Sequence, residues 1–327
     1  MTEAILLVGG MGTRLMPLTR STPKPMLPVA GLPVTEHQLL MAKRAGITSI
    51  VLATSYLSEI FIPYFGDGSR WGLDLRYAVE EQPLGTGGAI RNASALLNGD
   101  PTVVIFNGDV LTGHDLKKQI DFHASNKAEV TLHLTHVDDA RAYGCVPIDA
   151  NGRVSAFLEK MEKPVTNTIN AGCYVFERSV VEFIPENTVV SIEREIFPQL
   201  IAQGKNIFGF VDDSYWLDIG TPSALLKGSR DLVAGLLGGP HSEFLAGQGC
   251  SIDKDARVIA GSSLGNNVQV GKGSLIDGSI LCDGVSVGPG AEIIGSFIAP
   301  GTFIESDSKI VDSYCAIDGI SPLLDPK

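Results

Sequence analysis

The chain has 327 residues, of which 44% are hydrophobic and 19% charged, so a large core is expected and disorder is not. A net charge of −12 argues against a nucleic-acid binder, and no apolar run approaches the roughly 20 residues that span a bilayer. The start lacks the pattern of a secretory signal, and the five cysteines form no CxxC pair, so we expect a cytoplasmic protein with reduced thiols.

Strand-like and helix-like segments alternate over the first 230 residues. Short, apolar, β-branched runs predict the strands, and amphipathic stretches predict the helices. The predicted strands are 4–8, 49–54, 73–79, 102–107, 130–137, 169–176 and 207–211, and the clearest helices are 34–46 and 115–126. This order predicts an α/β fold with a mostly parallel, doubly wound, Rossmann-like sheet, whose ligands bind beyond the carboxyl ends of the strands.

From about residue 250 a six-residue repeat replaces that pattern. Small, polar and glycine residues separate aliphatic residues at Ile252, Val258, Leu264, Val270 and Ile276, then Cys282 and, after a slip, Ile304 and Ile310. A short fixed period predicts a solenoid, here a short left-handed parallel β-helix of hexapeptide repeats. The predicted domains are an α/β domain at 1–230, a linker at 231–250 and the β-helix at 251–327.

A glycine-rich loop follows the first predicted strand. The loop GGMGTR occupies residues 9–14, and Lys24 follows between two prolines. A dinucleotide fingerprint would need glycine at Leu15, and a P-loop would end in GK followed by Ser or Thr, so neither pattern matches. The alternatives are an ordinary glycine-rich turn and another nucleotide loop, in which backbone N–H groups approach phosphates while Arg14 and Lys24 supply positive charge.

The longer stretch GGMGTRLMPLT followed by PKPMLPV resembles the signature of the sugar-1-phosphate nucleotidyltransferases. Further matches follow in family order through EEQPLGTGGA, FNGDV, FLEK, INAGCYVF and YWLDIGTP, and the repeat region also fits several branches. The chain is most similar to the bacterial branch of mannose-1-phosphate guanylyltransferases, also called GDP-mannose pyrophosphorylases. This resemblance implies transfer of a nucleotidyl group from GTP to mannose 1-phosphate, with GDP-mannose and pyrophosphate as products.

The resemblance also implies a set of nucleotide-binding residues. They belong to the glycine loop, the EEQPLGTGGA loop and the FNGD turn, all of which follow predicted strands. The expected set is Leu7, Gly9, Gly10, Gly12, Thr13, Arg14, Lys24, Glu80, Pro83, Gly85, Thr86, Gly108 and Asp109.

Asp109 and Asp218 are the predicted metal ligands. Asp109 lies just after the strand TVVIFN, where a carboxylate beside a triphosphate would be repelled unless a cation lay between them. The alternative for each aspartate is a residue that stabilises a turn. The resemblance implies that Asp218 is the second protein ligand of the same Mg²⁺, and the expected catalytic residues are Arg14, Lys24, Asp109, Lys160 and Asp218.

Glu80 stands where relatives that use uridine or thymidine often carry glutamine. A carboxylate only accepts hydrogen bonds, and guanine offers an N–H and an NH₂ side by side, whereas uracil and thymine flank one N–H with two carbonyls. Glu80 therefore favours guanine if it, rather than Glu81, faces the base. The alternative is that both glutamates line a solvated strand end.

The segment FLEKMEKP contains two candidate lysines for the sugar phosphate. In relatives the lysine lies about ten residues before the asparagine of the NAG motif, which favours Lys160 over Lys163. The missing proline after Lys160 departs from the family pattern. The resemblance implies that sugar phosphate is bound by Gly144, Glu159, Lys160, Asn170 and Gly172.

Other functions remain as alternatives. The same chemistry could use glucose 1-phosphate with UTP or dTTP, or a heptose 1-phosphate with GTP. A hexapeptide acyltransferase is disfavoured because the last histidine, His241, precedes the coils, and a non-catalytic sugar-nucleotide-binding regulator would be expected to lack Arg14, Lys24 or a metal aspartate. Neither nucleic acid nor membrane is an expected partner, and a homodimer is expected from unpaired β-helix edges.

Overall fold

The structure is a computed structural model that describes residues 2–10, 12–20, 22–54, 58–239 and 241–325. Met11 of the glycine loop and Pro240 of the predicted linker lie outside the described residues. The chain divides into two compact units, which we call the sheet unit (Met1–Gly10 and His37–Trp216) and the coil unit (Met11–Glu36 and Leu217–Lys327). The coil unit thus includes residues 11–36 as well as the C-terminal part, and the sequential domain boundaries given above stay a prediction.

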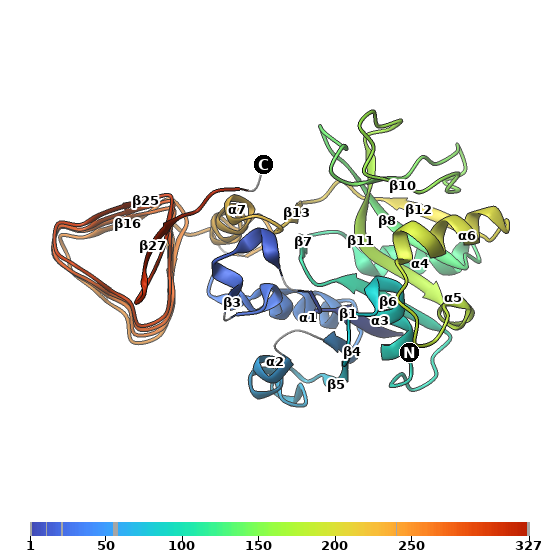
Figure 1. The fold of residues 1–327 in the computed structure, drawn as a ribbon, viewed down its shortest axis with the longest axis horizontal. Helices are drawn as coiled ribbons and strands as arrows, with labels where there is room; N and C mark the ends of the chain where they lie inside the picture. Colours follow the sequence, from blue (N-terminus) through green and yellow to red (C-terminus); the bar gives the residue numbers. More distant parts are fainter. Residues whose placement is uncertain (1, 11, 21, 55–57, 240, 326–327) are drawn as a thin grey trace. The chain divides into compact units, whose positions relative to one another are not determined.

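The sheet unit contains a nine-stranded sheet among its described residues. Seven strands match the predicted ones to within two residues. In chain order the strands are β1 (Glu3–Leu7), β4 (Ser49–Thr54), β5 (Asp74–Val79), β6 (Thr102–Asn107), β8 (Val130–His136), β9 (Gly144–Cys145), β10 (Leu158–Glu159), β11 (Thr168–Glu177) and β12 (Ile207–Val211). The main order is β10-β9-β11-β6-β1-β4-β5, and β8 pairs with both β11 and β12 (Figure 1).

The sheet is mixed, so the prediction of a mostly parallel sheet was too simple. Strands β6, β1, β4 and β5 run parallel to one another in the predicted manner, but β11 runs antiparallel to both β6 and β8. The cause is the connection between β8 and β11, which contains no helix over residues 137–167. Without a crossover helix the chain returns beside its own strand in the opposite direction.

Helices flank the strands and complete the core. Asp115 caps the helix after β7 (Val110–Thr112), since its side chain accepts a hydrogen bond from the N–H of Lys118 at 3.0 Å. Buried aromatic side chains, among them Tyr174, Phe176 and Phe197, lie at the centre of the core. The helices are α1 (Val34–Arg44), α2 (Ser58–Phe65), α3 (Gly85–Ser94), α4 (Leu116–Ser125), α5 (Arg178–Phe183), the π-helix η5 (Ile192–Ile196), α6 (Phe197–Ala202) and the short 3₁₀ helix η4 (Ser69–Trp71).

The coil unit begins with three 3₁₀ turns and a hairpin, continues with α7 (Pro222–Val233), and ends in stacked short strands. The early elements are η1 (Thr13–Leu15), η2 (Leu18–Arg20), η3 (Lys24–Met26), β2 (Pro28–Val29) and β3 (Leu32–Pro33). Thr221 caps α7 by accepting a hydrogen bond from the N–H of Ala224 at 3.3 Å, and Pro222 occupies the first turn.

Three sheets of parallel strands form the coils, consistent with a parallel β-helix, and in Figure 1 the stacked strands outline a triangle. One sheet contains β14 (Phe244–Ala246), β17 (Ser262–Leu264), β20 (Ile280–Leu281), β23 (Phe297–Ile298) and β26 (Ser313–Ala316), with β27 (Gly319–Pro322) antiparallel at its end. The second contains β15 (Ser251–Ile252), β18 (Gln269–Val270), β21 (Ser286–Val287) and β24 (Phe303–Ile304), and the third β16 (Arg257–Ile259), β19 (Leu275–Asp277), β22 (Glu292–Ile294) and β25 (Lys309–Val311).

The predicted six-residue step fails at one corner of the coil. It holds as far as Ile276, but the next interior side chain is Leu281 and not Cys282, because Leu281 pairs with Leu264 on the coil below. The corner between them turns through Gly278, which has a positive φ of 53°, and uses one residue fewer. Later coils keep this shorter corner, as Ile298 stacks on Leu281.

Among the described residues, every helix is too short or too polar to cross a lipid bilayer.

Candidate active site

The part of the glycine loop that begins at Gly12 packs against Thr19 and Lys24 in the coil unit. Gly12 has a positive φ of 57°, and a Cβ there would lie 2.9 Å from Thr19 Cγ2 and 3.0 Å from Lys24 Cβ. The hydroxyl of Thr19 donates a hydrogen bond to the carbonyl of Gly12 at 2.9 Å. Thr13 and Arg14 follow in η1 and are exposed, whereas Lys24 is buried in η3. The loop therefore presents Arg14 outward while holding Lys24 in place.

Three charged side chains of the coil unit converge at Gly220. Lys24 Nζ lies 3.9 Å from Asp218 Oδ1, and both side chains are largely shielded, with 11% and 22% exposed. A Cβ at Gly220 would come within 2.7 Å of Arg14 Nη2 and 3.0 Å of Asp218 Oδ1. Gly220 is thus the position that lets a guanidinium and a carboxylate approach the same point. Two predicted cationic residues and one predicted metal ligand are brought together.

Asp109 lies at the carboxyl end of β6 in the sheet unit. Gly108 lies against the end of β1, because its N–H donates to the carbonyl of Leu7 at 2.9 Å. Asp109 is half-buried in the turn from β6 to β7, and Gly9 and Gly10 are exposed directly beyond β1. The ends of two neighbouring parallel strands therefore adjoin, as expected for a ligand site in an α/β sheet.

Glu80 directly follows strand β5 and has one unsatisfied carboxylate oxygen. Its Oε2 accepts a long hydrogen bond of 3.4 Å from the N–H of Leu84, but its Oε1 is buried and has no hydrogen-bond partner among the described residues. Burial raises the pKa of the Glu80 carboxyl, and the Leu84 N–H only partly offsets this. Glu81, Pro83 and Gly85 are exposed. Of the two glutamates, Glu80 is the one held in place with an acceptor to spare.

Thr86, at the start of α3, has both hydrogen-bonding functions occupied by the protein. Its hydroxyl donates to Glu193 Oε2 at 2.7 Å and accepts from the N–H of Ile192 at 3.0 Å. Glu193 belongs to the π-helix η5 and also accepts from the hydroxyl of Ser191 at 3.0 Å. Thr86 therefore links this loop to η5, and its hydroxyl proton is not available to a ligand.

Gly144, Glu159 and Lys160 adjoin at the paired strands β9 and β10. Glu159 lies opposite Gly144, where a Cβ would come within 2.9 Å of Glu159 Oε2. Burial raises the pKa of the Glu159 carboxyl, although the Lys160 ammonium, 4.0 Å away, lowers it. Lys160 has a positive φ of 50° and its N–H donates to the carbonyl of Tyr143 at 3.1 Å. A non-glycine residue in this conformation is uncommon and is often found at functional sites.

Asn170 and Gly172 lie at an irregularity in β11. The pairing of β11 with β8 shifts register between Asn170 and Tyr174. Asn170 Nδ2 donates to the Tyr174 hydroxyl at 2.8 Å, and Asn170 Oδ1 accepts from the N–H of Gly172 at 3.1 Å. A Cβ at Gly172 would lie 3.1 Å from Asn107 Nδ2, so the bulge faces the end of β6.

The predicted residues thus fall into two sets. The sheet unit holds the EEQPLGTGGA loop, Asp109 and the sugar-phosphate residues, while the coil unit holds Arg14, Lys24 and Asp218. Sequence reasoning missed Glu193 and Asn107. Asn107 stands inside the FNGD motif, so its position at a strand end was a usable signal, whereas nothing in the local sequence around Glu193 connects it with Thr86.

A glycine loop after β1, shielded charged groups and acceptors at strand ends define an α/β nucleotide-binding enzyme. The chain belongs to the nucleotidyl transferase family, whose model matches residues 3–235. It is a nucleotidyltransferase.

Relatives and solved structures agree with this membership. The chain is 51% identical over 281 residues to a mannose-1-phosphate guanylyltransferase of Mycobacterium tuberculosis, a match that covers 84% of this chain and 78% of that protein. It is 35% identical over 267 residues to a mannose-1-phosphate guanyltransferase of Pichia angusta, covering 78% and 73%. The crystal structure of HddC from Yersinia pseudotuberculosis is 28% identical, with a TM-score of 0.61, and covers 71% of this chain and 100% of that one.

Proposed function

We propose that this enzyme transfers a guanylyl group from GTP to mannose 1-phosphate and thereby makes GDP-mannose and pyrophosphate. The observation that carries the choice of substrates is the 51% identity, over 84% of the chain, to a mannose-1-phosphate guanylyltransferase. HddC, a structural relative, has also been solved complexed with GMP-PN. The local geometry of each unit supports the same reaction.

Glu80 supports the choice of guanine. Its buried Oε1 has no hydrogen-bond partner among the described residues. The N–H groups of guanine can donate hydrogen bonds to this oxygen. A uracil or thymine carbonyl at the same place would face a carboxylate oxygen and leave it unpaired, at a cost of roughly 1–3 kcal/mol or more. Glu80 therefore acts as a specificity residue for the base, provided that the carboxylate is ionised.

A divalent metal is general for this family, and we propose Mg²⁺. Among the described residues there is no group of three or more His, Cys, Asp or Glu that could hold a metal ion. Mg²⁺ is usually held by only one or two carboxylates plus substrate phosphates. The shielded carboxylate of Asp218 beside the Gly220 cradle fits that requirement, as does the strand-end Asp109. A shared site for Asp109 and Asp218 stays a prediction.

The reaction needs little proton transfer, because the acceptor is already a phosphate dianion. An oxygen of the sugar phosphate attacks the α-phosphorus of GTP in line, a new P–O bond forms, and the α–β P–O bond breaks to release pyrophosphate. Arg14 and Lys24 stabilise the charge on the triphosphate, and Lys160 attracts the sugar phosphate. A bound Mg²⁺ would supply Lewis-acid stabilisation of the phosphate oxygens.

Glu159, Asn170 and the backbone at Gly144 and Gly172 are proposed to bind the sugar. Glu159 offers hydroxyl groups an acceptor next to the bare backbone of Gly144. The 4.0 Å separation between Lys160 Nζ and Glu159 Oε1 supports Lys160 rather than Lys163 as the phosphate ligand.

A substrate panel tests the proposal. Pyrophosphate release is measured for GTP, UTP and dTTP with mannose 1-phosphate, glucose 1-phosphate and a heptose 1-phosphate. The expected result is the highest kcat/KM for GTP with mannose 1-phosphate. A higher value for another pair would overturn the choice of substrates and leave the class of reaction intact.

Three further proposals concern the fold of the coils, the oligomeric state and the cellular location. We propose that the coils form a left-handed β-helix of hexapeptide repeats shortened at one corner, and that the chain assembles as a homodimer. A cytoplasmic location is supported by the five cysteines, which are all free. Analytical ultracentrifugation tests the dimer.

A further inference from the structure

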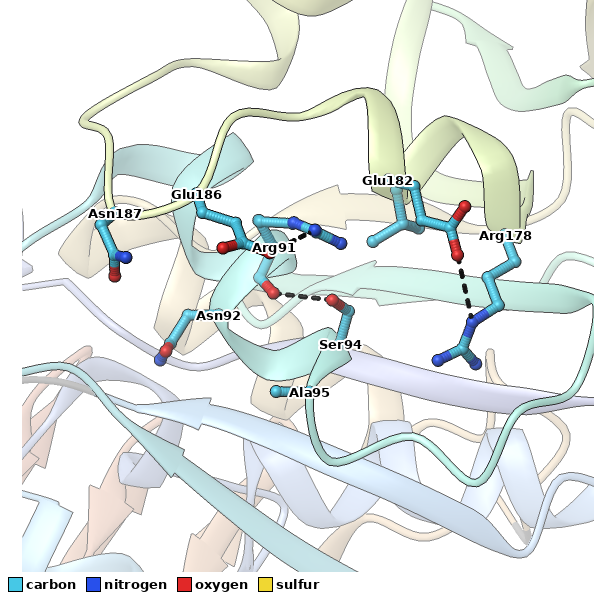
Figure 2. A pocket seen from close by; sticks show the side chains of 9 residues that line it. Arg91, Asn92, Ser94, Ala95, Arg178, Glu182, Glu186 and Asn187 are labelled. Carbon is cyan, nitrogen blue, oxygen red and sulfur yellow. Dashed lines mark hydrogen bonds and ion pairs between the residues drawn. The ribbon is translucent and has the colours of Figure 1, made fainter.

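A cavity of about 320 Å³ lies in the sheet unit, at the other end of α3 from the EEQPLGTGGA loop (residues 80–89), which we call the base loop. Its walls are the last turn of α3, helix α5 and the loop after α5 (Figure 2). The volume lies within the range of about 300–1,000 Å³ usual for small-molecule sites. The side chains that matter are those of Arg91, Ser94, Arg178, Glu182, Glu186 and Asn187. None of them is assigned a role in the proposed reaction.

Two arginines of this cavity form ion pairs with exposed glutamates. Arg91 Nη2 lies 2.5 Å from Glu186 Oε1, and Arg178 Nε lies 3.7 Å from Glu182 Oε1. The arginine side chains are 22% and 32% exposed, whereas Glu186 and Glu182 are 68% and 61% exposed. Ion pairs with such an exposed partner contribute only about 0–1 kcal/mol. The glutamates can therefore swing into solvent at little cost while the guanidinium groups stay.

These pairs also leave donors unused. Arg91 Nε and Arg178 Nη1 are buried and have no hydrogen-bond partner among the described residues. Buried donors are nearly always satisfied in folded proteins, so two such groups beside one cavity need an explanation. The hydroxyl of Ser94 already donates to the carbonyl of Arg91 at 2.7 Å, as Figure 2 shows, and so covers one acceptor at the end of α3. Two guanidinium donors beside the cavity are thus left unsatisfied by its own carboxylates.

We propose that this cavity binds a small phosphate-bearing molecule between Arg91 and Arg178. A phosphate dianion has enough oxygens and charge for two guanidinium groups, and arginine pairs with phosphate through two parallel hydrogen bonds. On binding, the anion replaces the carboxylates of Glu182 and Glu186. The amide of Asn187 and the hydroxyl of Ser94 lie beside it for the rest of the molecule.

The loop that lines the cavity continues into a segment that contacts the base loop. Asn187, with a positive φ of 51°, leads into a segment whose Val190 accepts a hydrogen bond from the N–H of Gly87 and donates one to the carbonyl of Leu84, both at 2.9 Å. A Cβ at Gly88 would lie 2.5 Å from the carbonyl oxygen of Thr188, so the two backbones are in close contact. Release of Glu186 therefore acts on the segment that supports Glu80 and Thr86. This coupling rests on the proposed function of that loop.

Calorimetric titration with inorganic phosphate tests the site in the full chain. GDP-mannose is first titrated alone and then kept saturating, so that phosphate does not enter the nucleotide site. One phosphate per chain is expected to bind. Arg91→Gln and Arg178→Gln are each expected to weaken binding at least about tenfold, because each removes a charge-assisted pair. Glu186→Gln is expected to strengthen binding about threefold, because it removes the competing carboxylate.

Arg153→Gln is the matched control, since Arg153 is exposed and its guanidinium carbon lies 5.9 Å above the Phe208 ring, away from the cavity. Equal phosphate affinity in all variants, or no binding at all, would overturn the site. Glu186→Gln keeps the test decisive if an arginine variant fails to fold.

The coupling to the base loop has its own test. By reciprocity, phosphate should change GDP-mannose affinity by the same factor that GDP-mannose changes phosphate affinity, and a factor of one would overturn the coupling. If GDP-mannose does not bind, the proposed function is refuted. Phosphate titration of the same variants in the absence of GDP-mannose then still tests the cavity.

Discussion

In the coils, serines at one corner stack seventeen residues apart and satisfy one another. The N–H of Ser279 donates to Ser262 Oγ at 3.2 Å, that of Ser296 to Ser279 Oγ at 3.0 Å, and that of Ser313 to Ser296 Oγ at 3.1 Å. Each of these hydroxyls in turn donates to a nearby backbone carbonyl, as Ser279 does to Asp277 at 2.8 Å. The first three serines are fully buried.

At the strand ends of the sheet unit, by contrast, two buried acceptors are unsatisfied. Glu80 Oε1 and Asn107 Oδ1 are buried and have no hydrogen-bond partner among the described residues. An unsatisfied buried acceptor costs stability, so a ligand that supplies donors is the natural explanation. At these positions the satisfied serines therefore indicate a structural role, and the two unsatisfied acceptors indicate a ligand. Other buried atoms without a hydrogen-bond partner among the described residues have no explanation in the structure, namely Gln38 Oε1, Thr54 Oγ1, His133 Nδ1 and Thr302 Oγ1.

Asp218→Asn offers the strongest test of this contrast. We expect kcat to fall at least about a hundredfold, because the variant weakens the charge stabilisation of the transferred phosphate. The free energy of unfolding should stay within about 1 kcal/mol of wild type. Pyrophosphate release at limiting Mg²⁺ measures the first quantity and urea denaturation the second. Asp318→Asn, which removes an exposed ion pair with Arg20, is the control. Normal turnover in Asp218→Asn would refute its role.

Two stacked histidines of the sheet unit give the next largest effect. The rings of His114 and His133 lie 3.8 Å apart, and burial, with a smaller contribution from His114, lowers the pKa of His133 to about 3. The unfolded chain, with an ordinary pKa near 6.5, then binds more protons below that pH, so His133 stabilises the fold above about pH 6.5 and loses this contribution as the pH falls toward 3.

At pH 4 the expected loss from His133 alone is about 3 kcal/mol relative to pH 7.5. Denaturant unfolding of wild type and His133→Gln at both pH values measures it. The variant should lose correspondingly less stability between the two pH values. Asp212 and His114 face His133 and also affect its pKa. An identical loss of stability in both proteins between the two pH values would show that His133 is not its source.

Glu80→Gln tests whether the unsatisfied oxygen of Glu80 selects the nucleobase. We expect kcat/KM for GTP to fall about 10- to 100-fold, because glutamine offers one acceptor in place of two, and the ratio of UTP to GTP use to rise. The exposed neighbour Glu81 provides the control variant, Glu81→Gln. A larger effect from Glu81→Gln would assign base recognition to Glu81 and leave the unsatisfied oxygen of Glu80 unexplained.

Ser279→Ala gives the smallest expected effect. It removes the acceptor for the Ser296 N–H and should lower the free energy of unfolding by about 1–2 kcal/mol with turnover unchanged. Ser286→Ala, in another sheet of the same coils, should change it by less than about 0.5 kcal/mol. Both values come from urea denaturation. Equal stability of the two variants would show that the stacked serines contribute nothing.

Much of this organisation could be predicted from local sequence. Short β-branched runs that end in glycine or asparagine identify strands, and a side chain that must be buried on one face repeats with the period of its element. For that reason the seven main strands and the change of pattern near residue 250 were found. The resemblance of whole motifs, rather than any one residue, led to the family.

The amino-acid sequence by itself determined the elements, the repeat and the chemical types of residue that follow each strand, because these depend on neighbours a few positions apart. Only the tertiary structure decided the antiparallel direction of β11, the five-residue corner before Leu281, the pairing of Thr86 with Glu193 and the meeting of Arg14 with Asp218 at Gly220. Each of these joins residues that are brought together by packing or by a connection without a helix. Local propensity carries no information about such distant partners.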